Sequence, residues 1–181
     1  MSTGPAFARS DVEFAGAGDV VLRGWYYVPA GSPGHPVPGV VLAHGFSAVK
    51  EMALDRFAEV FASAGLAVLV YDHRNLGASD GEPRQRIDPW AQIRDYRRAL
   101  DWLGARPEVD DARLAVWGSS FSGGEVLVIG ATDDRVRAVI AQAPYVGNPE
   151  LDDADGVQFA AMSAAALGDV PGPGEQLVGP M

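Results

Sequence analysis

The residues best suited to chemistry form a serine-rich turn after an apolar segment. Gly118-Ser119-Ser120-Phe121-Ser122-Gly123 directly follows the apolar run Leu114–Trp117 and precedes a hydrophobic, helix-like stretch. A strand that turns sharply into a helix at a serine needs small residues two positions before and after that serine, because larger side chains would collide with nearby backbone. With Ser120 at the centre, Gly118 and Ser122 meet this need. The pattern predicts that Ser120 is a nucleophile for acyl transfer.

Two backbone N–H groups are predicted to stabilise negative charge beside Ser120. Phe121 would begin the helix after the turn, so its N–H would point toward an oxyanion that forms at the serine. Phe46 comes shortly after the apolar run Val40–Ala43, and a second N–H donor is expected just after such a strand. We predict that four further residues support this oxyanion site: His44, Gly45, Gly118 and Ser122.

Other interpretations of these residues are weaker. A short Ser-Gly cluster is often an ordinary loop, and only the flanking apolar segments favour the nucleophile. Ser119 and Ser122 are less suitable nucleophiles than the central serine, and Ser122 is better explained as the small residue that the turn requires. His73 follows an apolar strand and is an alternative base that we do not favour. A metal site formed by His44, His73 and Asp72 lacks any local ligand spacing, so we predict no metal and no cofactor.

Alternating strand-like and helix-like segments from residue 11 to residue 142 must position these groups. Short apolar runs predict buried strands, and apolar residues three and four positions apart predict helices. The predicted strands are Asp11–Ala15, Val20–Val28, Val40–Ala43, Leu66–Tyr71, Leu114–Trp117 and Val136–Gln142. The predicted helices are Met52–Ala64, a helix that begins at Pro89, and residues 121–131. This order predicts an α/β fold with a doubly wound, mostly parallel sheet.

The helix that begins at Pro89 has the clearest start signal. Asp88 is suited to cap it, and proline fits the first helical position. Its predicted buried face consists of Trp90, Ile93, Tyr96, Leu100 and Leu103. Its three arginines, Arg94, Arg97 and Arg98, are interpreted as a solvated face with Asp95 and Asp101 as neighbouring partners.

Composition excludes several other classes of protein. The chain has 181 residues, 14 Lys+Arg against 24 Asp+Glu, a formal net charge of −10 and no Cys. Its hydrophobic content of 48% excludes a disordered chain, and its pI of about 4.6 argues against nucleic-acid binding. Neither a secretory signal nor an apolar run of about 18 residues is present. We therefore expect no membrane partner and, by default, a cytoplasmic location.

Four motifs resemble the α/β-hydrolase superfamily, in particular its esterase-like and peptidase-like members related to dienelactone hydrolases and Xaa-Pro dipeptidyl peptidases. They are the aromatic strand before Pro29, the turn His44-Gly45-Phe46, the loop at residues 71–79 and the serine turn at residues 117–124. Together they cover roughly residues 11–147. The resemblance implies a serine hydrolase that cleaves an ester, a thioester or a small amide through an acyl-serine intermediate. It does not identify the substrate.

The loop at residues 71–79 departs from its family pattern at one position. It resembles Asp-x-Arg-Gly-x-Gly-x-Ser, with Asn75 where glycine is usual. A left-handed backbone at that position would tolerate asparagine. The resemblance also implies that this loop is structural and that Asp72 pairs with Arg74 to hold it.

The resemblance further implies a catalytic acid and a histidine after the nucleophile, yet His35, His44 and His73 all precede Ser120. We therefore expect a C-terminally truncated hydrolase that lacks the last strands and helices. Residues 1–10 would be a flexible N-terminus, residues 11–147 the N-terminal part of the core, and residues 148–181 the beginning of a cap or an incomplete C-terminal segment. A serine without its base is a weak nucleophile, so this chain alone is expected to be nearly inactive.

Two kinds of function remain open from the sequence. In the first, the chain acts on a small-molecule ester or amide once a complementing C-terminal polypeptide supplies the missing histidine and acid. In the second, the chain is a catalytically inactive, hydrolase-like module that binds a small molecule or a partner through the same cleft. The serine turn favours the first function, and the lack of a histidine after Ser120 favours the second.

Overall fold

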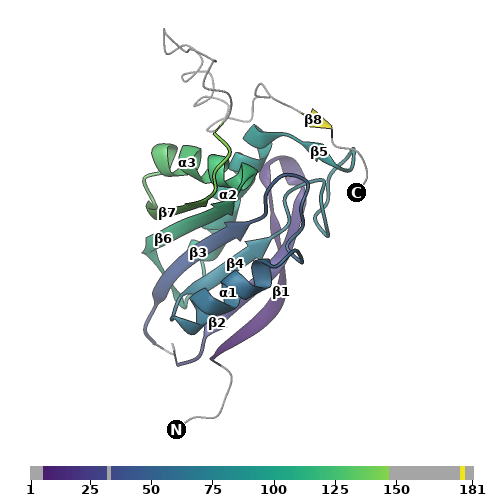
Figure 1. The fold of residues 1–181 in the computed structure, drawn as a ribbon. Helices are drawn as coiled ribbons and strands as arrows, with labels where there is room; N and C mark the ends of the chain where they lie inside the picture. The colour runs from purple at the N-terminus through teal and green to yellow at the C-terminus, as the bar shows by residue number, and fades with distance from the viewer. Residues whose placement is uncertain (1–5, 32–33, 147–175, 178–181) are drawn as a thin grey trace.

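The computed structural model describes residues 6–31, 34–146 and 176–177, and it contains a twisted six-stranded sheet (Figure 1). The strands of this sheet are β1 (Phe7–Ala15), β2 (Val21–Pro29), β3 (Val37–Ala43), β4 (Ala67–Tyr71), β6 (Val109–Ser119) and β7 (Val136–Gln142). The helices are the 3-10 turn η1 (Ala17–Asp19), α1 (Leu54–Ser63), α2 (Pro89–Gly104) and α3 (Phe121–Thr132). A separate short antiparallel pair joins β5 (Arg86–Ile87) to β8 (Gln176–Leu177).

The sheet has the order β1-β2-β4-β3-β6-β7 and is mostly parallel on the side that carries the candidate site. β1 and β2 form an antiparallel hairpin, and β2 runs antiparallel to β4. β3 runs parallel to both β4 and β6, and β6 runs parallel to β7. Since the parallel strands end at one edge of the sheet, the loops after β3, β4 and β6 meet there. The predicted α/β fold is confirmed.

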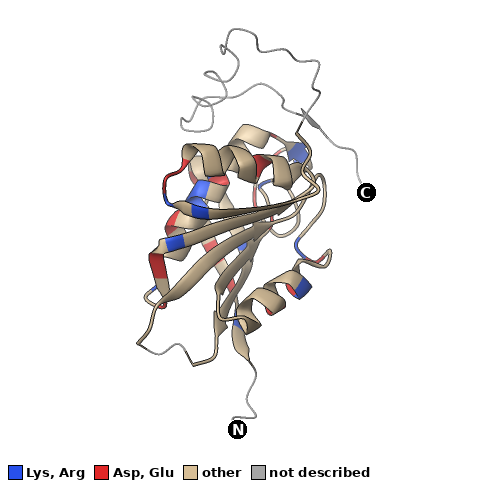
Figure 2. Cartoon of the chain, turned by 60° about the vertical axis from the view of Figure 1, so that its left-hand side comes forward, with Lys and Arg blue, Asp and Glu red and all other residues tan. Residues whose placement is uncertain are grey.

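Helices cover both faces of the sheet, which is why the central strands are almost wholly apolar. On one face, α1 contributes Leu54, Ala58 and Ala62 to a core that includes Trp117 of β6. On the other face, α2 and α3 pack over a larger core that extends to the β1–β2 hairpin. Figure 2 shows that the charged residues lie mainly on helices, loops and strand ends, while the middle of the sheet is uncharged.

Several boundaries differ from the predictions because strand pairing extends past the apolar runs. β1 begins at Phe7, four residues earlier than predicted, since its polar residues pair in register with β2 up to Phe7 opposite Pro29. β6 begins at Val109 instead of Leu114, because Val109 and Asp110 pair with the first residues of β3. β7 has the predicted bounds. Nearly all of the predicted C-terminal segment 148–181 lies outside the described residues.

The start of α2 is as predicted, whereas the role of Asp95 is not. Asp88 Oδ1 accepts a hydrogen bond from the Ala91 N–H at 3.0 Å, which is the predicted cap. Asp95 was expected beside the arginines of its own helix, but it is fully buried and binds Arg74 from the loop after β4, with an Nη2–Oδ1 distance of 2.6 Å. Asp95 Oδ1 also accepts from the Ala17 N–H at 2.9 Å. This ion pair therefore ties α2 to two loops.

The substitution Asp95→Ala tests this tie. It would leave the Arg74 guanidinium largely buried without its counter-charge, so we expect a loss of about 3–5 kcal/mol in the free energy of unfolding. Urea unfolding followed by circular dichroism would measure this loss. The matched control is Asp101→Ala. Asp101 lies on the same helix and forms exposed ion pairs with Arg98 and Arg135. The control should lose no more than about 1 kcal/mol, and equal losses in both variants would contradict the assignment.

Candidate active site

Ser120 occupies the sharp turn between β6 and α3, and its backbone is strained. Its φ of 57° and ψ of −114° fall outside the regions that non-glycine residues usually adopt and cost about 1–3 kcal/mol. The surrounding backbone holds this conformation. The Ser120 N–H donates to the Gln142 carbonyl at the end of β7 at 2.9 Å, and the Ser120 carbonyl accepts from the Tyr145 N–H at 2.8 Å. The residue itself is exposed to solvent.

The turn requires small residues on two sides, in agreement with the sequence pattern. A Cβ atom at Gly118 would overlap the Ser122 carbonyl and lie 2.9 Å from the Gly123 nitrogen. A Cβ atom at Gly45 would lie 2.9 Å from the Ser119 carbonyl oxygen and 3.2 Å from Ser120 Cβ. The loop after β3 is therefore pressed directly against the serine turn, and glycine permits this approach.

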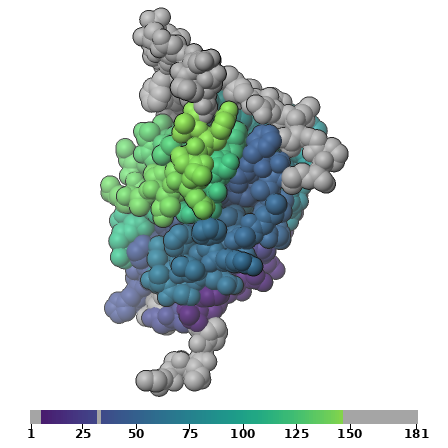
Figure 3. All heavy atoms as spheres, in the orientation of Figure 1, coloured from purple at the N-terminus to yellow at the C-terminus, as the bar shows by residue number. Residues whose placement is uncertain are grey.

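The two residues predicted to supply N–H donors also come together. The rings of Phe46 and Phe121 meet edge to face, with centroids 5.5 Å apart. Phe121 is the first residue of α3, so its N–H is one of the free donors at the helix N-terminus. A pocket of about 440 Å³ opens beside Ser120, between the loop after β3 and the end of β7 at Gln142. Figure 3 shows the loop after β3 and the residues around β7 next to each other on the same face of the molecule.

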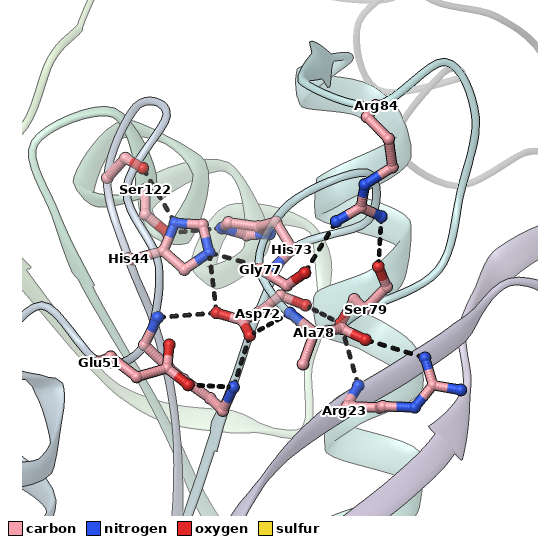
Figure 4. A network of polar contacts seen from close by, with 12 residues as sticks. Arg23, His44, Glu51, Asp72, His73, Gly77, Ala78, Ser79, Arg84 and Ser122 are labelled. Carbon is pink, nitrogen blue, oxygen red and sulfur yellow. Dashed lines mark hydrogen bonds and ion pairs between the residues drawn. The ribbon is translucent and has the colours of Figure 1, made fainter. Parts of the chain in front are cut away.

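Beneath the turn, two histidines connect the three loops that meet at this edge (Figure 4). His44 Nδ1 lies 3.0 Å from the Gly45 carbonyl, and His44 Nε2 accepts from the His73 backbone N–H at 3.1 Å. This arrangement makes His44 the neutral tautomer with the proton on Nδ1, in agreement with burial, which lowers its pKa. Its function is to link the loop after β3 to the loop after β4.

Ser122 is the centre of a second buried cluster rather than a mere small residue of the turn. Its Oγ lies 2.9 Å from the Tyr96 hydroxyl, 3.2 Å from Glu125 Oε2 and 3.4 Å from His73 Nε2. All four side chains are buried. Burial lowers the pKa of His73 well below its usual range and raises the pKa of Glu125 well above its usual range. Burial therefore favours the neutral form of both groups in this cluster.

The expected pairing between Asp72 and Arg74 is wrong. Asp72 Oδ2 binds Lys50 Nζ at 2.6 Å and accepts from the Ala78 N–H at 2.9 Å, while Asp72 Oδ1 accepts from the Lys50 N–H at 2.7 Å. Arg74 lies on the other side of the loop and pairs with Asp95. The loop is structural, as the resemblance implied, but Asp72 and Arg74 each bind a different residue instead of each other. Asn75 has φ of 67°, so its backbone is left-handed, which is the condition under which asparagine was expected to be tolerated.

The sequence contained two signals for the residues that were missed. Lys50 is the only lysine in the chain, and the structure buries it against Asp72. Glu125 is the only charged residue of α3, in the otherwise apolar or small segment Phe121–Thr132. A lone charge in an apolar helix implies a buried polar partner, although its identity depends on the fold.

The comparisons with known proteins agree with this architecture. The model of the X-Pro dipeptidyl-peptidase (S15 family) matches residues 18–158, which is more than half of the chain. The chain belongs to the S15 family. It is similar to a thiohydrolase from Eupenicillium brefeldianum, with 44% identity over 80% of this chain and 46% of the relative. It is also similar to the polyketide transferase grgF from a Penicillium species, with 40% identity over 82% of this chain and 50% of the relative.

A solved structure supports the same fold for this S15 chain. The α/β hydrolase GrgF from Penicillium sp. sh18 matches with a TM-score of 0.69 and 39% identity, over 79% of this chain and 49% of that chain. The chain spans about half the length of the curated relatives that it matches. Two of these relatives are themselves named as a thiohydrolase and an α/β hydrolase.

The described residues offer neither a metal-ion site nor a membrane-spanning helix. Residues 6–31, 34–146 and 176–177 contain no group of three or more His, Asp or Glu side chains that could hold a metal ion. Within the same ranges, every helix is too short or too polar to cross a bilayer.

The close approach at Gly118 makes a first prediction for this site. In Gly118→Ala, the new methyl group would push against the Ser122 backbone, so we expect a loss of about 1–3 kcal/mol in the free energy of unfolding. Thermal and urea unfolding would measure it. The control Gly104→Ala places its methyl group 3.4 Å from the nearest atom, at the end of α2. The control should be unchanged or up to about 1 kcal/mol more stable. A Gly118→Ala protein as stable as the control would refute the packing argument.

The buried histidine makes a second prediction, for pH. The pKa of His73 lies well below the 6.5 of a free histidine in the folded protein, so below pH 6.5 the unfolded chain binds the extra proton. Stability contributed by the neutral histidine is therefore complete above that pH and is lost as the pH falls, by about 1.4 kcal/mol per pH unit. The slope of unfolding free energy against pH should be smaller by this amount in His73→Asn. Carboxyl groups outside this cluster contribute equally to both proteins, so identical slopes would contradict a neutral His73.

Proposed function

We propose that this chain carries the nucleophile and the oxyanion site of a serine hydrolase that acts by acyl transfer. The observation that carries the proposal is the strained, exposed backbone of Ser120 at the N-terminus of α3, with Gly45 packed against it. Strain of this kind persists only where the surrounding structure enforces it, and it is concentrated at functional sites. An ordinary loop would have no need of this conformation.

The geometry supports one sequence of bond changes. Ser120 Oγ attacks the carbonyl carbon of an ester, thioester or small amide, and the carbonyl electron pair moves onto its oxygen. The N–H groups of Phe46 and Phe121 donate to that oxyanion. When the carbonyl forms again, the bond to the leaving group breaks and an acyl-serine remains. A base takes the proton of Ser120 and delivers it to the leaving group, and water then releases the acid by the same steps.

The base and its acid are proposed to come from polypeptide outside this chain. Ser120 is followed by 61 residues without a histidine, counted as 181 − 120. His73 is unsuited to the role because it is buried and its Nε2 atom lies beside Ser122 Oγ. A polypeptide that pairs with β7 would bring new groups to the edge where Ser120 lies, since Ser120 already bonds to the end of that strand.

Among the possible substrates, the relatives favour an acyl group bound through sulfur or transferred to another acceptor. One is named a thiohydrolase and another a polyketide transferase. Both reactions are compatible with an acyl-serine intermediate, which either water or a second nucleophile can resolve. We therefore place thioesters first and other esters second, with small amides third because their leaving group is poorer.

A second candidate is a binding module without catalysis, and one observation favours it. The sequence supplies no histidine after the nucleophile position. Such a module would use the same pocket beside Ser120. It would gain nothing from a strained serine, so the first candidate explains more of the structure.

Labelling with a fluorophosphonate distinguishes the two candidates. We expect a slow covalent adduct on Ser120, located by mass spectrometry, because the oxyanion donors retain roughly 10³-fold or more of rate enhancement without the other catalytic residues. The adduct should be absent in Ser120→Ala and present in Ser119→Ala, which is the matched control in the same turn. Phosphonylation that is no faster than that of free serine, or that is unaffected by Ser120→Ala, would favour the binding module.

A further inference from the structure

A second pocket lies between α2 and α3, and Phe121 forms part of its wall. Its volume is about 300 Å³, and its walls include Trp90, Ile93, Leu127 and Tyr145 together with Phe121. All of these side chains are apolar or aromatic, and the apolar part of a ligand would displace water from them favourably. The chemistry described for Ser120 makes no use of this pocket.

Two walls of the pocket are fixed relative to Ser120. Phe121 is the next residue in the chain, and its ring stacks on that of Tyr145 with centroids 6.1 Å apart. The backbone N–H of Tyr145 donates to the Ser120 carbonyl at 2.8 Å. A carbonyl group bound at the Phe121 N–H would therefore lie beside the Phe121 ring, and a chain attached to it could continue past that ring into the pocket.

One polar side chain lines this otherwise apolar pocket. Glu125 is only 4% exposed, and its Oε2 atom bonds to Ser122 Oγ at 3.2 Å. Its other oxygen, Oε1, is itself buried and has no hydrogen-bond partner among the residues that the structure describes. A buried oxygen without a partner costs free energy, and a ligand hydroxyl that reached it from the pocket would recover that cost. Burial raises the pKa of Glu125 well above its usual range, which favours the neutral carboxylic acid.

We propose that this pocket binds the acyl part of the substrate, and that it selects an apolar or aromatic chain that carries a hydroxyl group for Glu125. This inference rests on the proposed function and specifies its substrate class. A hydroxyl group is the suitable partner because it can accept from a protonated carboxyl and donate to its carbonyl oxygen. An ammonium group would require an ionised carboxylate, which burial opposes.

Binding of phenylbutanol to the chain tests the pocket without any need for catalysis. Butylbenzene is the matched probe, because it lacks only the hydroxyl group. We expect both to shift the NMR signal of the Trp90 indole N–H, with phenylbutanol bound roughly three- to tenfold more tightly, as one hydrogen bond predicts. In Glu125→Met this preference should fall to about one, and in Glu125→Gln it should be largely retained. A preference that is unchanged in Glu125→Met would overturn the role of Glu125.

A variant that fills the pocket tests where the ligand binds. Its result does not depend on whether the Glu125 variants fold. Leu127 is 42% exposed at the pocket, so Leu127→Trp adds bulk there without entering the core. It should weaken binding of both probes at least roughly fivefold, since it removes contact area. The control Val60→Trp lies on α1, at a side chain that is 67% exposed. Equal binding by both variants would place the ligand elsewhere.

Two phosphonates separate failure of this inference from failure of the proposed function. A fluorophosphonate with a hydroxyl-bearing phenylalkyl chain should label Ser120 faster than its methyl analogue does, and Leu127→Trp should remove the advantage. If both reagents label Ser120 at the same rate, the nucleophile stands and the acyl pocket is wrong. If phenylbutanol binds as expected but neither reagent labels Ser120, the pocket stands as a binding site and acyl transfer is wrong.

Discussion

The rest of the site depends on one constraint, which is the close approach of three backbone segments around Ser120. β6 must end where α3 begins, with no linker between Ser119 and Phe121 beyond a single residue at positive φ. The loop after β3 must reach that residue, and Gly45 allows it to do so. The parallel pairing of β3 with β6, which places Ala43 opposite Gly118, fixes the distance between them. The pairing of the central strands thus fixes the spacing between the backbone segments of the site.

A strained residue needs a rigid support, and here the support is polar as well as apolar. His44, His73 and Ser122 link the loops after β3 and β4 to the first turn of α3. Tyr96 extends the link from α2 to the carbonyl of Trp117, at a distance of 2.9 Å. Because these groups are buried, the loss of any partner in the cluster is costly. The cluster therefore resists any rearrangement that would relax the serine turn.

Local rules predicted those parts of the fold and of the candidate site that depend on neighbours in sequence. The order of strands and helices, the cap at Asp88, the left-handed Asn75 and the small residues around Ser120 all follow from short-range sterics and periodicity. The charge pairs were not predictable in this way. Asp72 and Asp95 each lie next to arginines in the sequence, yet their actual partners, Lys50 and Arg74, lie about 20 residues away and are brought to them by the fold.

Glu125 shows why such a residue is informative once the fold is known. A buried carboxyl group that only stabilised the core would be expected to have hydrogen-bond partners for both oxygens. One oxygen instead belongs to the cluster under the serine turn, the other is buried without a partner among the described residues, and Glu125 itself lines the second pocket. A ligand at that oxygen would pull on the same hydrogen bonds that support Ser120. Substrate recognition and support of the nucleophile would then share a single side chain.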